Sequence, residues 1–506
     1  MKNKIIIGDL EIFKKKKIQY LIDNNLWPLS KNDFNKFGTE FFEFFFKIIY
    51  SQNKEMQNYG IVFVRYLLYF LFHIQIRYAV NYAKKNNIAY IANVKNQKID
   101  FQFLESNFLR NNFLYILKLK IKSIIKFFYY NFKIHGFYSF VYIFKEKYIH
   151  LGSYSNLSAS ILKNEKKLAK FHYSEFYLNS YYTSIKNNSK KINNANKIYI
   201  NPLLDKIKSI EKLYTATEDL EKIKFIFREK LASIIDFYNF LIKLNITNKK
   251  FIVNEPTNIH HKIISFAFDL ENDVSIIHHG NDYCLNDNKI GYILNYGNNS
   301  KVIVNDEIMA KNYSIYFKEN LDRLQSTNFI NFAKKDSLKS LKQDHFQNNL
   351  NTNKKIKNKK ILLVGYPMNM KREIYESYLW FHSQIILEYN LLKLFKKNNI
   401  SITYKAHPDR IEELGNIFDD YCDEIVKNKF EDEYHKYDFI LFTYPTTTCF
   451  GFAIKTDKKI ILLDQGVPWI DKNTSILKNV KIVKIMNSYD KNSIPAEDIL
   501  NFIKDN

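Results

Sequence analysis

Cysteine is scarce in this chain of 506 residues, which has only Cys284, Cys422 and Cys449. The three are far apart and form no C-x-x-C pair, so the sequence predicts neither a disulfide framework nor a zinc site. This cysteine usage is typical of a reducing compartment. No other group of residues has metal-ligand spacing, and we expect no bound metal and no resident cofactor.

Glycine and proline are also few, with 12 and 8 residues. Neither G-x-G-x-x-G nor G-x-x-x-x-G-K-[S/T] occurs, which disfavours dinucleotide redox cofactors and P-loop ATP chemistry. The stretch Met1 to Asp9 is strand-like, and it is too short and polar for a signal peptide.

A convincing membrane span is missing as well. The most apolar long stretch, Ile61 to Val80, contains Arg65 and Arg77. A charge near the middle of a span costs roughly 2.5–3.5 kcal/mol. The sequence therefore predicts a buried helix here, and we expect a cytoplasmic protein.

Aromatic residues and positive charge are abundant. The 37 Tyr and 43 Phe, within an apolar content of 46%, argue against disorder. The length predicts two or three domains. The 76 basic and 52 acidic residues give a formal charge of +24. Nucleic acid, anionic lipid and phosphorylated substrates all fit this charge, and so does a lysine-rich surface without a specific partner.

The region from about 40 to 245 is predicted to be mainly helical and rich in aromatic residues. On the expected helix Phe113 to Phe132, Lys118, Lys122 and Lys126 recur every four residues and share one face. Two interpretations remain open. The lysines form the solvated face of a core helix, or they form a basic amphipathic surface in peripheral contact with the inner leaflet of an anionic membrane.

After residue 250, short apolar stretches alternate with helical patterns, which indicates an α/β fold with parallel sheets. The expected strands are 251–253, 274–277, 301–304, 360–364, 401–405, 439–442 and 459–463. The expected helices include 260–268, 380–395, 411–418 and 448–456. The polar segment 336–358 is interpreted as a linker between an N-terminal domain, 1–335, and a C-terminal domain, 359–506.

Unusual residues follow the strands of the C-terminal domain, where parallel sheets bind their ligands. They are Gly365, Tyr366, Lys405, His407, Pro408, Arg410, Tyr444, Thr446, Thr447 and Thr448. A histidine such as His407 can donate to a phosphate oxygen, and hydroxyls at a helix N-terminus add donors where backbone N–H groups already favour an anion. The alternatives are a loop histidine without a partner and an ordinary threonine N-cap.

Glu255 and His279 are the catalytic candidates of the N-terminal domain, because each follows an expected strand. A carboxylate there suits a general base for an acceptor hydroxyl, or a nucleophile. The histidine suits stabilisation of negative charge or proton relay. A structural or helix-capping role for Glu255 remains an alternative.

These motifs resemble those of the GT-B glycosyltransferases of bacterial surface-carbohydrate assembly. The motifs are His278-His279-Gly280, His407-Pro408, the threonine cluster and the segment Tyr437 to Trp469. The most similar are transferases of CMP-activated ulosonic acids, such as Kdo or sialic acid, and the CDP-glycerol glycerophosphotransferases are also similar. The resemblance covers about residues 250–470, and His-His-Gly replaces the usual Gln-His-Gly.

The resemblance implies a GT-B-like fold with two Rossmann-type domains facing a cleft. It implies that His407-Pro408 and Thr446 to Thr448 contact the cytidine monophosphate of a nucleotide-sugar donor, with His279 at the reaction centre and no bound metal. The acceptor would be a surface polysaccharide, a lipopolysaccharide or another glycan or lipid-linked molecule.

Three other functions stay open at this point. One is a polyol-phosphate transferase that uses CDP-glycerol. Another is a nucleic-acid-binding protein, suggested by the charge and the aromatic content. The basic residues are spread along the chain rather than clustered, so we expect no nucleic-acid partner. The last is a scaffold protein without catalysis.

Overall fold

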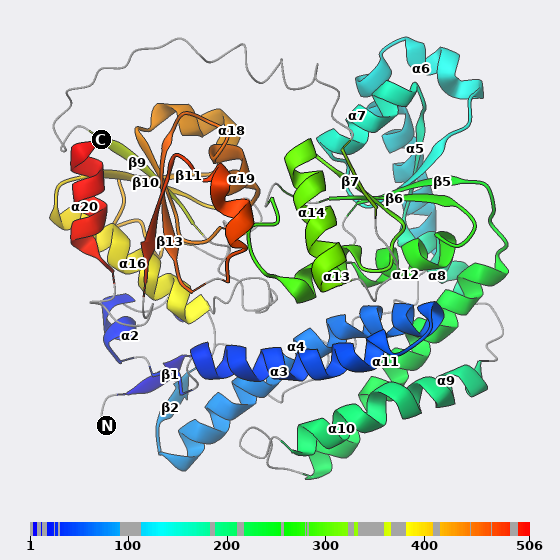
Figure 1. Ribbon diagram of the computed structural model, residues 1–506, viewed down its shortest axis with the longest axis horizontal. Helices are drawn as coiled ribbons and strands as arrows, with labels where there is room; N and C mark the ends of the chain where they lie inside the picture. The colour runs from blue at the N-terminus through cyan, green and yellow to red at the C-terminus, as the bar shows by residue number, and fades with distance from the viewer. Residues whose placement is uncertain are drawn as a thin grey trace.

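Two six-stranded sheets, each with all its strands parallel, organise the protein in the computed structural model (Figure 1). The mixed α/β class expected from the sequence is therefore confirmed. The structure describes residues 4–7, 12, 18–24, 26–28, 31–91, 113–182, 188–209, 217–254, 258–278, 280, 283–321, 328–331, 359–365, 381–407, 415–445, 447–466, 468–485 and 494–506.

The C-terminal sheet has the order β11-β10-β9-β12-β13-β14. From β9, the next two strands along the chain are added on one side of the sheet. From β12, the next two are added on the other side, so the direction in which strands are added reverses between β9 and β12. The strands are β9 (Lys360–Val364), β10 (Ser401–Lys405), β11 (Glu424–Val426), β12 (Phe439–Phe442), β13 (Lys459–Asp464) and β14 (Val480–Lys484). The sequence predicted four of them, and it missed β11 and β14 at the two edges.

The N-terminal sheet has the order β4-β3-β5-β6-β7-β8. Its strands are β3 (Tyr148–Leu151), β4 (Ala169–His172), β5 (Lys250–Val253), β6 (Asp273–Ile277), β7 (Lys301–Val304) and β8 (Asn328–Asn331). The prediction of a mainly helical region from 40 to 245 is wrong for β3 and β4. These strands contain histidine and lysine, so they lack the continuous apolar run by which a buried parallel strand is recognised.

Helices surround both sheets. They are α2 (Ile18–Asn24), α3 (Lys31–Tyr50), α4 (Lys54–Lys85), α5 (Phe113–His135), α6 (Tyr138–Val141), α7 (Asn156–Glu165), α8 (Ser174–Tyr182), α9 (Ser189–Ala195), α10 (Asn201–Lys208), α11 (Thr217–Lys243), α12 (Ile259–Phe268), α13 (Lys289–Tyr296), α14 (Glu307–Asn320), α16 (Phe381–Lys397), α18 (Phe430–Glu433), α19 (Thr448–Ala453) and α20 (Ala496–Asp505). The prediction of a helix at 411–418 is wrong for residues 415–418, the part that the structure describes, because these residues are in turns. Gly415 there has a φ of +54°, a left-handed conformation that ends a helix.

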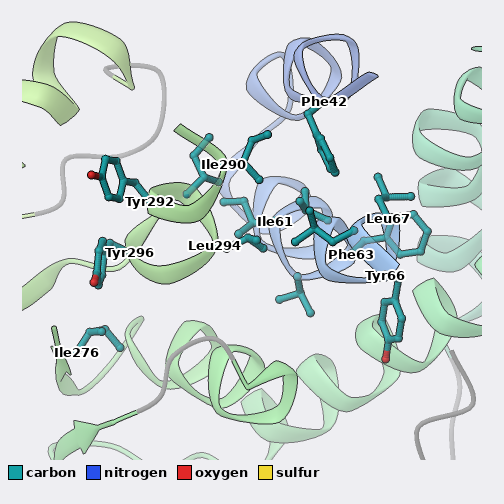
Figure 2. Close-up of a cluster of buried hydrophobic side chains, with 14 of the residues drawn as sticks. Phe42, Ile61, Phe63, Tyr66, Leu67, Ile276, Ile290, Tyr292, Leu294 and Tyr296 are labelled. Atoms are coloured by element: carbon teal, nitrogen blue, oxygen red, sulfur yellow. The ribbon is translucent and has the colours of Figure 1, made fainter. Parts of the chain in front are cut away.

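The long helix α4 connects the two apolar cores. Its first half packs against α13, and Figure 2 shows Ile61 of α4 beside Ile290 and Leu294 of α13 in one buried cluster. Further along the helix, Ile76 belongs instead to the cluster formed by the C-terminal sheet with α16 and α20. A helix of 32 residues is about 48 Å long, enough to reach both cores.

Among the described residues, α4 is the one helix long and apolar enough to cross a membrane. In its most apolar window, 81% of the residues are buried inside the protein. This agrees with the prediction of a buried helix for Ile61 to Val80.

The N-terminal segment packs against the C-terminal sheet, although the two are far apart in sequence. Strand β1 (Ile5–Ile7) pairs with β2 (Ala89–Ile91), and Ile5 and Leu21 lie in the same apolar cluster as β9 and α16. The hydroxyl of Tyr389 in α16 donates to Gln19 Oε1 over 2.5 Å. Residues from both ends of the chain therefore build this core.

His150 of β3 predicts a loss of stability in acid. Its side chain is fully buried, neither ring nitrogen has a hydrogen-bond partner among the described residues, and burial lowers its pKa to about 3. The unfolded chain binds a proton near the ordinary pKa of about 6.5, so stability is lost as the pH falls from about 6.5 towards 3. By linkage, His150 accounts for about 2 kcal/mol between pH 7 and pH 5.

A His150→Leu variant should therefore lose less of its unfolding free energy between those two pH values than the wild type, as measured by urea denaturation. His435→Leu is the control, because His435 is exposed. Equal acid sensitivity in the wild type and His150→Leu would contradict the assignment.

Candidate functional site

The site residues expected in the C-terminal domain follow β9, β10 and β12, at one edge of the sheet. Gly365 follows β9, His407 lies two residues beyond β10, and Tyr444 to Thr448 follow β12. The strand order reverses between β9 and β12, which is where open parallel sheets bind ligands. Four of the expected residues, Tyr366, Pro408, Arg410 and Thr446, lie outside the described residues.

A buried polar cluster lies directly beneath this edge. It consists of Gln384 and Glu388 from α16, Tyr404 from β10, Thr443 after β12 and Gln465 after β13, which we call the Glu388 cluster. The Tyr404 hydroxyl donates to Glu388 Oε2, and Gln384 Nε2 donates to Glu388 Oε1, each over 2.6 Å. Gln465 Nε2 donates to the Thr443 carbonyl over 2.9 Å. One buried carboxylate thus connects α16 to the ends of β10 and β12, and Gln465 joins the cluster through Gln384 and Thr443.

The electrostatics of the cluster keep Tyr404 as a hydrogen-bond donor. Burial, together with the neighbouring Glu388 carboxylate, raises the pKa of Tyr404 well above its ordinary value. Glu388 is itself fully buried, and hydrogen bonds to a buried charge offset part of its desolvation. Tyr404 also explains why residue 365 is a glycine, because a methyl group at that position would overlap the Tyr404 hydroxyl.

The side chains of Lys405 and His407, two positions apart, differ in their exposure to solvent. Lys405 is 3% exposed, and its Nζ donates to the Ala406 carbonyl over 2.7 Å. Burial lowers the pKa of Lys405. His407 is half-buried beyond the strand end. Of the two, His407 is the side chain accessible to a ligand.

The threonines after β12 begin a short helix. Thr447 is the N-cap of α19, and its side chain accepts from the Cys449 N–H over 3.3 Å. Thr448 is exposed at the first position of the helix. The expected helix ran to residue 456, but α19 ends at Ala453 after six residues. The macrodipole of so short a helix adds little to anion binding, so an anion here would depend on hydrogen bonds from the hydroxyls and from individual N–H groups.

The catalytic candidates Glu255 and His279 lie outside the described residues, but their neighbours are described. Asn254 directly follows β5, and His278 directly follows β6. His278 is 3% exposed, and its Nδ1 is 2.6 Å from the Tyr296 hydroxyl. His278 is therefore a buried residue that packs against Tyr296 and does not face a ligand.

The loop after β6 contacts the threonine cluster of the other sheet. Gly280 has a φ of +100°, and a Cβ built there would be 3.3 Å from Thr448 Oγ1. The Asn305 side chain donates to the Gly280 carbonyl over 3.0 Å and holds this loop. The carboxyl ends of β6 and β12, from the two different sheets, therefore meet at this contact.

Backbone pairing joins the two halves beside this contact. Segments 285–287 and 468–470 form an antiparallel bridge with two hydrogen bonds of 2.8 Å. Asp464 at the end of β13 positions the second segment, because its carboxylate accepts from the Gly466 N–H and from Trp469 Nε1, each over 3.0 Å. A salt bridge of 2.7 Å between Lys455 and Asp306 also crosses this junction.

Sequence reasoning missed the Glu388 cluster and the role of Asp464. Glu388 had a detectable signal, because a charged residue at this position falls on the apolar face of α16 with Ile385 and Leu392. Neither hydrogen-bonding set could be predicted, because the partners are distant in sequence.

Comparison of the chain with protein-family models, with curated proteins and with solved structures found no match. Within the described part of the chain, no group of three or more His, Cys, Asp or Glu residues is arranged to hold a metal ion.

Tyr404→Phe tests the Glu388 cluster. The variant removes a donor to a buried carboxylate, so we expect a loss of about 1.5–3 kcal/mol in unfolding free energy. Tyr389→Phe is a matched control on the neighbouring helix, because its hydroxyl donates to the neutral Gln19. In a Glu388→Gln background the loss from Tyr404→Phe should shrink. The same loss in both backgrounds would show that the hydroxyl acts independently of the carboxylate.

Proposed function

We propose that this protein is a metal-independent GT-B glycosyltransferase that transfers a sugar, a CMP-activated ulosonic acid, to a glycan or lipid-linked acceptor of the cell surface. The C-terminal sheet would hold the nucleotide, and the N-terminal sheet would supply the acceptor side and the base. The observation that carries this proposal is the closeness of Gly280, in the loop after β6, to Thr448 at the start of α19.

The topology of the C-terminal half supports a nucleotide site. In its strand order the first three strands step one way and the last three the other, an arrangement that binds nucleotides at the point of reversal. Thr448 follows β12, at the point of reversal, and His407 follows β10, which is next to β9; neither residue is fully buried. The Glu388 cluster beneath them would fix the loops in the geometry that a rigid ligand requires.

The reaction would use groups from both halves. Glu255 would take the proton of the acceptor hydroxyl, and the freed oxygen would form a bond to the anomeric carbon of the donor. The bond between that carbon and the CMP phosphate would break, and CMP would leave with the electron pair. His407, Thr447 and Thr448 would donate to the phosphate, and His279 would stabilise its developing charge.

His407→Ala tests the nucleotide site. Loss of a hydrogen bond to a charged phosphate should weaken CMP binding by roughly tenfold or more, as measured by calorimetry. His435→Ala is the matched control, because this exposed histidine precedes β12 at the opposite edge of the same sheet. CMP and CMP-sugars should bind more tightly than UDP- and GDP-sugars. Absence of binding by all of these nucleotides would refute the proposal.

Glu255→Gln tests the base. The amide keeps the shape of the side chain but cannot accept a proton, so turnover of a CMP-sugar should fall by roughly a hundredfold or more. The affinity for CMP should remain within about twofold of the wild type, because Glu255 belongs to the other half. Full activity in this variant would assign the base to another residue.

A further inference from the structure

The segment that contains α5, α6 and the 3₁₀ turn Tyr142–Phe144 has an unusual surface, which we call the 113–144 hairpin. Of the nineteen large apolar side chains exposed in the described part of the chain, thirteen lie on it. Phe137 and Phe144 are 80% and 93% exposed, and Ile125 and Phe128 are 62% and 58% exposed. Apolar residues gathered in this way on a protein surface mark an interaction site.

The hairpin is held firmly with this face outward. On the opposite side of α5, Asn131 donates to the Ala169 carbonyl over 3.0 Å and accepts from the Ala169 N–H over 2.9 Å. Ser123 also donates to the Phe171 carbonyl. These side chains pair with the free edge of β4, the last strand of the N-terminal sheet. Rotation of α5 would break them, so the apolar face stays turned to solvent.

Apolar and basic residues occupy adjacent stripes on α5. At 100° per residue, the exposed side chains of Leu117, Ile121 and Phe128 fall on one line along the helix. A row of lysines follows one margin of that line, and consists of Lys118, Lys122, Lys126 and Lys133. The sequence predicted the shared face of the first three lysines, but not the exposed apolar stripe beside them.

The aromatic surface continues beyond the end of α5. Gly136, with a φ of +56°, turns the chain into α6, which lies at the outer tip of the molecule in Figure 1. Between the two helices is a hollow of about 310 Å³ whose lining includes Phe132, Phe140 and Ile143. The hairpin thus presents aromatic rings, an apolar recess and lysines on one protruding part of the molecule.

We infer that the 113–144 hairpin is a docking surface for an anionic lipid bilayer. Helices that lie in a membrane interface have an apolar face with aromatic residues and a lysine-rich margin, and that combination is present here. The lysines complement acidic headgroups, as does the net charge of +24. The inference does not depend on the proposed function, although a lipid-linked acceptor would lie in the same plane as the docked hairpin.

Co-sedimentation of the full chain with vesicles tests this surface. The wild type should pellet with vesicles that contain phosphatidylglycerol, and much less with vesicles of phosphatidylcholine alone. The double variant Ile125→Asp, Phe128→Asp should bind at least about tenfold more weakly. Phe225→Asp, Ile308→Asp is the matched control, because these apolar residues are 65% and 51% exposed outside the hairpin. The control should bind like the wild type.

Three results would overturn the inference. The first is a wild type that pellets with neither kind of vesicle, and the second is a control that loses as much binding as the hairpin variant. The third is a wild-type dimer in analytical ultracentrifugation that the hairpin variant disrupts while vesicle binding persists, which would assign the face to a second copy. CMP affinity, measured on the same hairpin variant, should be unchanged, so this test and that of the nucleotide site fail independently.

Discussion

Parallel pairing of every strand is the constraint on which the rest of this structure depends. A parallel strand can follow another only through a crossover, so each sheet needs helices on its faces, and its strands become buried on both sides. All the loops that follow the strands then emerge at one edge. The candidate nucleotide residues are at such an edge because of this topology, and the Glu388 cluster lies just beneath it.

The sequence predicted those elements that are buried on both sides. Strands β7, β9 and β12 are apolar apart from a lysine at the start of β7 and of β9, and their predicted ends agree with the structure to the residue, as do those of the more polar β10. Strand β4 was missed because it alternates buried and exposed positions at a sheet edge, and there Asn131 and Ser123 satisfy part of its backbone. Helix α19 was predicted too long, since nothing in the sequence indicates where its packing against the sheet ends.

The position of the candidate site could be predicted from the sequence, but the hydrogen-bonded residues beneath it could not. His407 and the threonines could be located from strand ends alone. The members of the Glu388 cluster come from α16 and from the ends of three strands that are far apart along the chain, so only the fold brings them together. The steric reason for a glycine at position 365 was equally hidden, because the Tyr404 hydroxyl that would overlap a side chain there comes from a distant part of the chain. The exposed stripe of α5 was hidden because an apolar helix face is read from sequence as core.

The antiparallel bridge between segments 285–287 and 468–470 restricts how the two halves can move. A bridge of two backbone hydrogen bonds does not stretch, but the chains on either side can swivel about it. The Lys455–Asp306 ion pair and the hydrogen bond from Asn473 to the Cys284 carbonyl link the same two halves, so a movement that slid the sheets past each other or separated them would break these contacts together with the bridge.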